Sequence, residues 1–251
     1  MSGHSKWATT KHRKGALDAK RGKIFTKIIR EITVAARSGG GDPVGNARLK
    51  LAIQKGKDAN MPADNIKKAV QRGTGEIAGV SYEAMTYEGY GPGGTAVMVE
   101  VLTDNKNRAV SEVRHIFSRY GGSIGEAGCV AWMFEKKGSL IVDRKAMDED
   151  RLLALALEAG AEDVGIDDPT QFEVTTAPQD FESVKKALSD VAIPLRSSEI
   201  TFRAKNQIAL DLRAAESLLR LTETLDDNDD VQNVYTNADI PDDVMAQIST
   251  L

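Results

Sequence analysis

The sequence DAKRGKIFTKIIREITVAAR, residues 18–37, decides the first part of the fold. Isoleucines at positions 24, 28 and 32 recur at the spacing of one helix face, so the stretch predicts an amphipathic helix. The opposite flank carries a row of cations, Lys20, Lys23, Lys27, Arg30 and Arg37, which we call the basic ridge. This helix is therefore expected to pack through one face and to present positive charge on the other.

Two shorter helices are expected to follow the first one. The glycine-rich stretch 38–41 ends the first helix, and Asp42-Pro43 fits the cap and first turn of a second, which runs to about residue 58. Met61-Pro62 opens a third helix, and Gly73 is expected to close it. The N-terminal part of the chain is therefore predicted to be an all-helical domain.

The charge of the chain is divided between this domain and the remainder. Residues 1–73 carry 17 Lys and Arg against 5 Asp and Glu, whereas residues 74–251 carry 16 against 32. Cations in such excess repel one another, and a polyanion that neutralises them releases its own counterions. We therefore expect residues 1–75 to form a basic domain that binds nucleic acid. An anionic membrane is a less favoured partner, because the apolar helix face is needed to hold the helices together.

The residues expected to contact nucleic acid come from an N-terminal arm, residues 2–16, and from the basic ridge. The arm holds four cations, two histidines and one tryptophan, with little material for a core. The predicted phosphate contacts are Lys6, Lys11, Arg13, Lys14, Lys20, Arg21, Lys23, Lys27 and Arg30. Trp7 and His12 are the candidates for stacking or shape contacts. Trp7 has a second open role, which is to dock against the helical domain.

The acidic remainder has the pattern of α/β structure. Apolar residues at 95–102 predict a buried strand, and residues 107–120 predict a helix. Residues 129–134 and 139–142 are expected to be the two strands of a hairpin about a turn at 136–138.

From residue 139 to residue 203 the expected order is strand, helix, strand, strand, helix, strand, which is the ferredoxin-like arrangement. A later helix at 208–225 and a strand at 231–235 would complete the domain that precedes this unit. The predicted fold class is therefore α+β and multidomain, with a basic helical domain followed by two α/β domains. Residues 143–204 are expected to be inserted in a domain formed by 76–142 and 205–251.

No set of residues in the sequence predicts an active site. Residues 89–94 match the dinucleotide pattern G-x-G-x-x-G, but a strand is expected after the glycines where the pattern requires a helix. The motif therefore predicts a turn between two strands. His115 follows Ser111 by four residues on a predicted helix, but no third group is placed to orient it. The chain is expected not to be an enzyme and to need no cofactor.

The acidic stretch near residue 226 resembles the start of a calcium-binding loop through Asp226, Asn228 and Asp230. The match ends there, because Val231 and Asn237 occupy the positions of the required glycine and the bidentate glutamate. The stretch therefore predicts a solvated acidic turn and no metal site.

Composition points to a cytoplasmic protein. The single cysteine, Cys129, excludes an intramolecular disulfide and fits a reducing compartment. The longest apolar runs are far shorter than a membrane span, so no membrane partner is expected.

Several motifs in one order resemble the YebC family over essentially the whole chain. They are Gly3-His4-Ser5-Lys6-Trp7, Lys11-His12-Arg13-Lys14, and residues 18–25, 59–62, 64–66, 87–92 and 229–237. Thr9-Thr10 and Ala47 depart from the commonest form of the family but leave its basic pattern unchanged.

The resemblance implies three domains, with the third inserted in the second, in a cytoplasmic bacterial protein described as a DNA-binding transcriptional regulator. It also implies a second function, because similar proteins activate translation in organelles or help bacterial ribosomes past proline-rich stalls. A translation factor would use the same cations on ribosomal or transfer RNA. No zinc-finger, leucine-zipper or recognition-helix pattern is present to read bases. The acidic domains would leave surfaces for the ribosome or for proteins of the transcription machinery.

Overall fold

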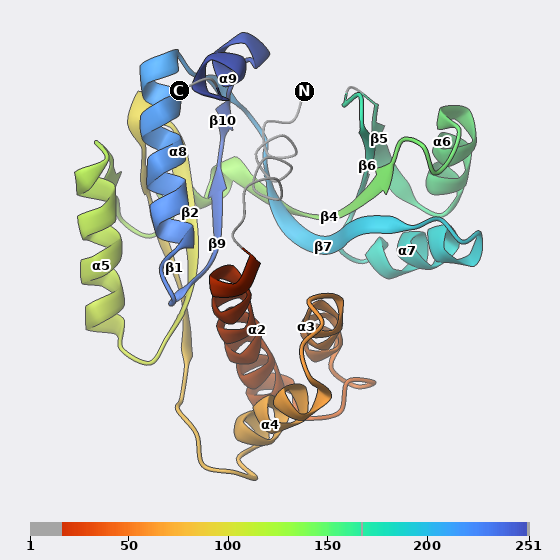
Figure 1. The fold of residues 1–251 in the computed structure, drawn as a ribbon, viewed down its shortest axis with the longest axis horizontal. Coiled ribbons are helices and arrows are strands. Elements are labelled where there is room, and N and C mark those ends of the chain that lie inside the picture. Colours follow the sequence, from red (N-terminus) through yellow and green to blue (C-terminus); the bar gives the residue numbers. More distant parts are fainter. Residues whose placement is uncertain (1–16, 167, 250–251) are drawn as a thin grey trace. The chain divides into compact units, whose positions relative to one another are not determined.

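The computed structural model describes residues 17–166 and 168–249, with backbone alone for residues 17–21 and 249 (Figure 1). The described chain divides into two compact units. The smaller unit is Trp132–Gln207, and the larger one contains the residues up to Ala131 and those from Ile208 onwards. The larger unit thus groups the helical part with a sheet. The smaller unit begins at Trp132, whereas the insertion expected from the sequence begins at residue 143.

Three helices form the first part of the larger unit: α2 (Leu17–Gly39), α3 (Ala47–Asp58) and α4 (Ala63–Thr74). Their shared core contains Ile28 and Ile32 from α2, Leu49 from α3 and Ile66 from α4. The apolar face predicted for the first helix is therefore confirmed at Ile28 and Ile32, whereas Ile24 is 47% exposed. In the described residues, no helix is both long and apolar enough to cross a membrane.

Two of these helix ends differ from the expectation. Helix α3 begins at Ala47 rather than at Asp42-Pro43, because the Asn46 side chain caps it by accepting a hydrogen bond from Leu49 N at 3.0 Å. Helix α4 continues through Gly73 to Thr74 and is capped by Gly75, which has a φ of 84°. A Cβ at Gly73 would lie 2.6 Å from Ala36 Cβ, so this glycine permits close packing of α4 on α2.

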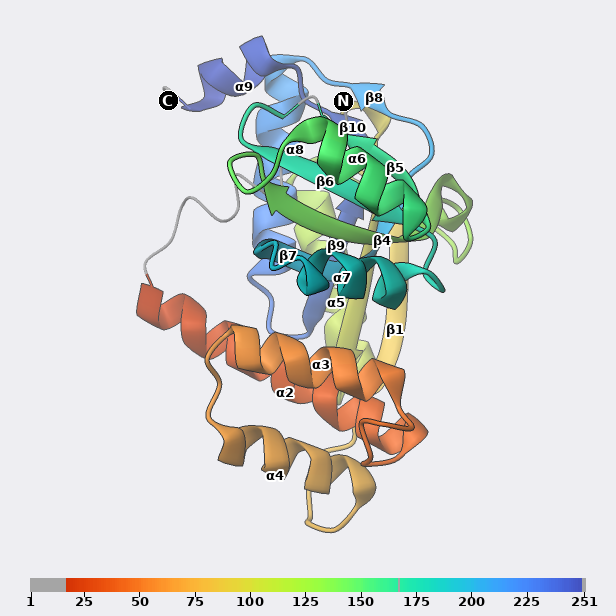
Figure 2. The same cartoon turned by 90° about the vertical axis from the view of Figure 1, so that its right-hand side faces the viewer.

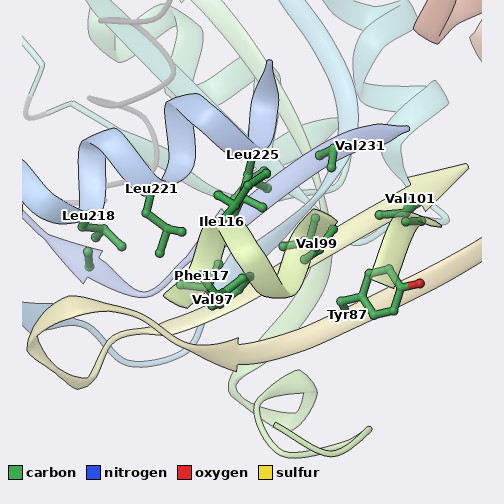
Figure 3. Packing of buried hydrophobic residues seen from close by; sticks show 14 of the residues in the cluster. Tyr87, Val97, Val99, Val101, Ile116, Phe117, Leu218, Leu221, Leu225 and Val231 are labelled. Atoms are coloured by element: carbon green, nitrogen blue, oxygen red, sulfur yellow. The ribbon is translucent and has the colours of Figure 1, made fainter. Parts of the chain in front are cut away.

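The sheet of the larger unit has the order β3-β1-β2-β9, and all its neighbouring strands are antiparallel. Val97 and Val99 from β2 pack in one core with Phe117 from α5 and Leu221 from α8 (Figure 3). The remaining short elements of the unit include the parallel pair β8 and β10 and the C-terminal helix α9, none of which is expected from the sequence. The bounds are β1 (Glu83–Tyr90), η1 (Pro92–Gly94), β2 (Ala96–Thr103), α5 (Lys106–Arg119), β3 (Ser123–Ile124), β8 (Ile208–Ala209), α8 (Leu212–Asp226), β9 (Val231–Thr236), β10 (Ala238–Asp239) and α9 (Asp242–Ser249).

The smaller unit has the predicted ferredoxin-like order of elements. Its antiparallel sheet runs β5-β6-β4-β7, and helices α6 and α7 lie on the same face of it (Figure 2). The bounds are β4 (Phe134–Asp143), α6 (Glu149–Glu158), β5 (Ala161–Gly165), β6 (Gln171–Thr176), α7 (Phe181–Asp190) and β7 (Leu195–Ala204), preceded by the short helix η2 (Ala131–Met133).

The hairpin expected at 129–142 is wrong. Strand β4 runs without a break from Phe134 to Asp143 and pairs with both β6 and β7. Gly138 lies inside this strand, where a Cβ would approach Phe181 Cδ2 to 2.6 Å. The glycine therefore makes room for a side chain of α7 and does not form a turn.

Candidate nucleic-acid interface

The predicted contact residues fall into three groups in the structure. Those of the N-terminal arm lie outside the described residues: Lys6, Trp7, Lys11, His12, Arg13 and Lys14. Lys20 and Arg21 lie in helix α2, where the backbone alone is described. Lys23, Lys27 and Arg30 lie further along α2 and are described with their side chains.

These last three cations contact one stretch of the chain, residues 226–230, which we call the acidic segment. Lys23 Nζ lies 3.4 Å from Asp227 Oδ1, and Lys27 Nζ lies 3.3 Å from Asp226 Oδ1. Arg30 Nη1 completes the row at 2.6 Å from Asp230 Oδ1. Lys23, Lys27 and Arg30 of the basic ridge are thus ion-paired along successive turns of α2, whereas Arg37 donates a hydrogen bond to Ser81 Oγ.

Exposure falls steadily along this row of pairs. The side chains of Lys23 and Asp227 are 45% and 70% exposed, and those of Lys27 and Asp226 are 18% and 21% exposed. Arg30 and Asp230 are 12% and 5% exposed. Water and salt screen an exposed pair far more than a buried one, so the attraction is strongest at Arg30 and weakest at Lys23.

Asp230 joins three parts of the larger unit. Besides pairing with Arg30, its carboxylate accepts hydrogen bonds from Thr103 Oγ1 and Arg108 Nη2, both at 2.8 Å. Burial by itself would raise the pKa of Asp230, but the hydrogen bonds from Arg108, Thr103 and Arg30 outweigh it and lower the pKa. The ionised carboxylate therefore ties α2 to the end of β2 and to the start of β9.

Arg30 makes further contacts at this junction. Its Nη1 donates to Leu102 O at 3.2 Å and to Asp229 O at 2.5 Å. Its guanidinium lies over the Tyr82 ring, 5.2 Å from the ring centre. Arg30 is thus held by several groups of its own unit, and a phosphate would have to compete with all of them.

The solvated acidic turn expected at residues 226–230 is wrong for Asp230, which is 4% exposed. Arg30 and Asp230 are 200 positions apart, and a pattern read along the chain does not relate charges over that distance. The signal that could have found the contact is the match between cations at 23, 27 and 30 and acids at 226, 227 and 230. Within the described ranges, no group of three or more His, Cys, Asp or Glu is placed to hold a metal ion.

A second set of cations lies on α3 and α4. Arg48, Lys57 and Lys67 are exposed, and none of them makes an ion pair within the described part of the chain. Two neighbouring lysines are paired, Lys55 with Glu31 at 3.6 Å and Lys68 with Asp64 at 2.6 Å. The contacts predicted from the sequence lie in the arm and on the basic ridge and do not include Arg48, Lys57 or Lys67.

The positive surplus of the helical part survives these pairings. Residues 22–75 contain eleven Lys and Arg against four Asp and Glu. Three further acids reach α2 through the acidic segment, which still leaves cations in excess. The chemistry available here is the binding of anions by Lys and Arg at a helical surface.

The glycine-rich motif at 89–94 forms the predicted turn between two strands. Gly91 N donates to Thr95 O at 2.8 Å, and Gly93 and Gly94 have φ values of 72° and 73°. Strand β2 follows directly, so the glycines do not lead into the helix N-terminus that a dinucleotide site requires.

Comparison with known proteins gives close relatives along almost the whole chain. A probable transcriptional regulatory protein of Desulfatibacillum aliphaticivorans is 58% identical over 247 residues, which cover 98% of this chain and 100% of that protein. A protein of the same name from Geobacter sulfurreducens is 56% identical over 248 residues, covering 99% and 100%. These relatives carry the name of a regulatory protein and not of an enzyme, in agreement with the prediction that this chain is not an enzyme.

A solved structure is also similar. The crystal structure of a conserved hypothetical protein from Aquifex aeolicus matches with a TM-score of 0.83 and 43% identity, over 92% of this chain and 95% of that one.

Two family descriptions account for most of the sequence. The TACO1/YebC protein N-terminal domain matches residues 5–76, which include the helical part with its surplus of cations. The TACO1/YebC second and third domain matches residues 82–238, which include both four-stranded sheets. The chain therefore belongs to the TACO1/YebC family.

Proposed function

We propose that this protein is a nucleic-acid-binding regulator of gene expression, and specifically a DNA-binding transcriptional regulator. The observation that carries the proposal is that α3 and α4 present several exposed cations, among them Arg48, Lys57 and Lys67, in a part of the chain with a large positive surplus. Its relatives bear the name of probable transcriptional regulatory proteins, which supports the same function.

The binding we propose is mainly to phosphates. Lys and Arg side chains position a protein on the sugar-phosphate backbone, and the released counterions supply most of the affinity. Cations on two neighbouring helices can contact more than one phosphate at a time. The predicted contacts of the arm, with Lys20 and Arg21, would extend the same surface, and Trp7 and His12 would supply stacking or shape contacts.

The test is a charge reversal on α3 and α4 with a matched control. The triple variant R48E/K57E/K67E is expected to bind a 30-base-pair duplex at least tenfold more weakly than the unchanged protein. The slope of log K against log salt should become shallower by about 2 to 3, because up to three phosphate contacts are lost. The control K136E/K145E/K205E makes the same change of charge at exposed lysines of the smaller unit.

The outcomes separate the possible functions. Weaker binding by the first triple, with little change in the control, supports the proposal. Equal losses in both triples, or no binding of nucleic acid by the unchanged protein, would overturn it. Tighter binding to transfer RNA or ribosomes than to duplex DNA at the same salt concentration would replace the transcriptional regulator by a ribosome-associated translation factor.

A further inference from the structure

The acidic segment occupies part of the surface that was predicted to bind phosphates. We propose that residues 226–230 act as an internal competitor of nucleic acid, covering Lys23 and Lys27 until a phosphate backbone displaces Asp226 and Asp227. This inference rests on the proposed function, because it describes how the same basic domain is regulated.

The contacts of the acidic segment resemble those that a phosphate backbone would make. Lys23 Nζ donates to the Asp227 carbonyl at 3.1 Å as well as to its carboxylate, and Lys27 Nζ donates to the Asp226 carbonyl at 2.6 Å as well as to its carboxylate. Arg30 likewise meets one carbonyl and one carboxylate of the segment. Each cation thus meets a pair of oxygens, which is also what a phosphodiester offers.

The exposure of the pairs indicates which of them can open. Lys23 and Asp227 remain largely in solvent, so this pair adds little to packing and another anion can replace it. Asp230 is buried and is also held by Thr103 and Arg108. Exposure is thus greatest at the Asp227 pair, lower at the Asp226 pair and lowest at the Asp230 pair. Opening would therefore begin at Asp227 and would leave the junction with Arg30 in place.

The experiment compares two double variants that remove the same amount of charge. D226N/D227N neutralises the outer acids of the segment, and E126Q/D243N neutralises two exposed acids of the same unit that make no ion pair within the described residues. Binding of a 30-base-pair duplex and of transfer RNA is measured from low to moderate salt. Because both variants change the net charge equally, the difference between them reports the loss of local competition.

We expect D226N/D227N to bind about tenfold more tightly than the control variant at low salt. Its slope of log K against log salt should be steeper by up to about 2, because two further cations become available to phosphates. Equal affinities and slopes for the two variants would overturn the proposal that the acidic segment competes with nucleic acid, while leaving the proposed function in place. Absence of binding by the unchanged protein and by both variants would overturn both.

Hydrogen exchange on the unchanged protein gives an independent readout. Asp227 N donates to Glu223 O, and Asn228 N donates to Leu225 O, so both amides are held by the last turn of α8. Their exchange reports whether this turn loosens when the side chains of the segment are displaced. Added nucleic acid should speed exchange at residues 226–229 and leave strand β9 protected. Slower exchange at 226–229 in the bound protein would mean that the segment closes on binding, which contradicts the proposal.

Discussion

Asp230 and Asp227 belong to one acidic segment, yet they should differ greatly in their effect on stability. Asp230 is buried and accepts hydrogen bonds from Arg30, Arg108 and Thr103, whereas Asp227 is mostly in solvent beside Lys23. A buried charge that loses its partner keeps the full cost of its desolvation, whereas an exposed charge is hydrated again. At the scale of single residues, burial therefore decides which ion pair matters.

The first prediction concerns this pair of aspartates. The substitution Asp230→Ala should lower the free energy of unfolding by about 3 kcal/mol, because Arg30 is left buried without its carboxylate. Asp227→Ala should lower it by less than about 1 kcal/mol. Urea unfolding followed by circular dichroism measures both values, and similar losses for the two variants would contradict the argument from burial.

Glu88 gives a second prediction, which depends on pH. Glu88 is 7% exposed, and its carboxylate accepts hydrogen bonds from the backbone N–H groups of Gly128, Val130 and Ala131 at 2.7, 2.8 and 2.7 Å. Burial alone would raise the pKa of Glu88, but the three hydrogen bonds outweigh it and lower the pKa below its ordinary value of 4.5. The stability from this lowered pKa is complete above pH 4.5 and is lost as the pH falls through the folded-state pKa.

Glu88→Gln should therefore lower the free energy of unfolding by about 2 kcal/mol at pH 7. The glutamine amide keeps one acceptor oxygen, but its NH2 group would face a backbone N–H, which is also a donor. The difference between the two proteins should shrink as the pH falls below 4.5, because Glu88 of the unfolded chain takes up a proton there before Glu88 of the folded protein does. Urea unfolding at a series of pH values checks both statements. A difference that stays constant down to pH 3 would refute the role given to the ionised carboxylate.

At the scale of elements, helices α2 and α4 approach each other closely where Gly73 faces Ala36. Small residues at such a crossing let two backbones come together, and any added atom must push them apart. The three helices around this point share one core, so a shift of α4 would also disturb the positions of the cations that it carries. The spacing between these helices is therefore set by glycine and alanine.

The third prediction tests this crossing. Gly73→Ala should destabilise the protein by about 1 to 3 kcal/mol, since the new methyl would meet Ala36 Cβ at 2.6 Å. Gly45→Ala is the control, because a Cβ there meets nothing within 4 Å and the backbone needs no positive φ. The control should leave stability unchanged or raise it by up to about 1 kcal/mol. Thermal unfolding of both variants measures the two changes in stability, and equal values for Gly73→Ala and Gly45→Ala would contradict the prediction.

At the scale of the whole molecule, the two compact units are each built around their own sheet. Within the described residues, the smaller unit is one continuous stretch of chain with a complete ferredoxin-like set of elements. Its own side chains supply a core, including Leu140, Phe172, Phe181 and Leu188, each almost fully buried. A continuous segment with its own core and a complete set of elements has what independent folding requires.

The fourth prediction is that residues 132–207 fold when they are expressed alone. The isolated unit should show mixed α and β circular dichroism and a single cooperative thermal transition. Phe181→Asp in the same fragment should abolish the transition, because a charge would enter the core. A fragment that gives no transition without this substitution would show that the smaller unit depends on the rest of the chain.

Ion pairs within the larger unit also determine which charge reversals can test binding. Replacing Lys20, Lys23 and Lys27 by Glu would test the basic ridge if these side chains were free. Two of them pair with the acidic segment, so their reversal would also place like charges opposite Asp226 and Asp227. Reversal at Arg48, Lys57 and Lys67 avoids this effect and is the cleaner test of binding.

The sequence by itself determined the features that depend on neighbours along the chain. The period of apolar residues predicted α2, the order of elements predicted the ferredoxin-like unit, and the glycines at 89–94 predicted a turn. The division of charge, which is a property of composition, pointed to nucleic acid as the partner. Each of these features depends on residues close together in the chain or on total composition, so it can be predicted from the sequence without the fold.

Tertiary structure decided the features that depend on distant residues. Gly138 was expected in a turn, but its place inside β4 is explained by Phe181, which follows 43 positions later in the chain. Arg30 was selected as a phosphate contact, but its surroundings include Asp230, which folding brings within 2.6 Å from 200 positions away. Only the fold brings such residues together, because their contact depends on the path of the whole chain and not on local spacing.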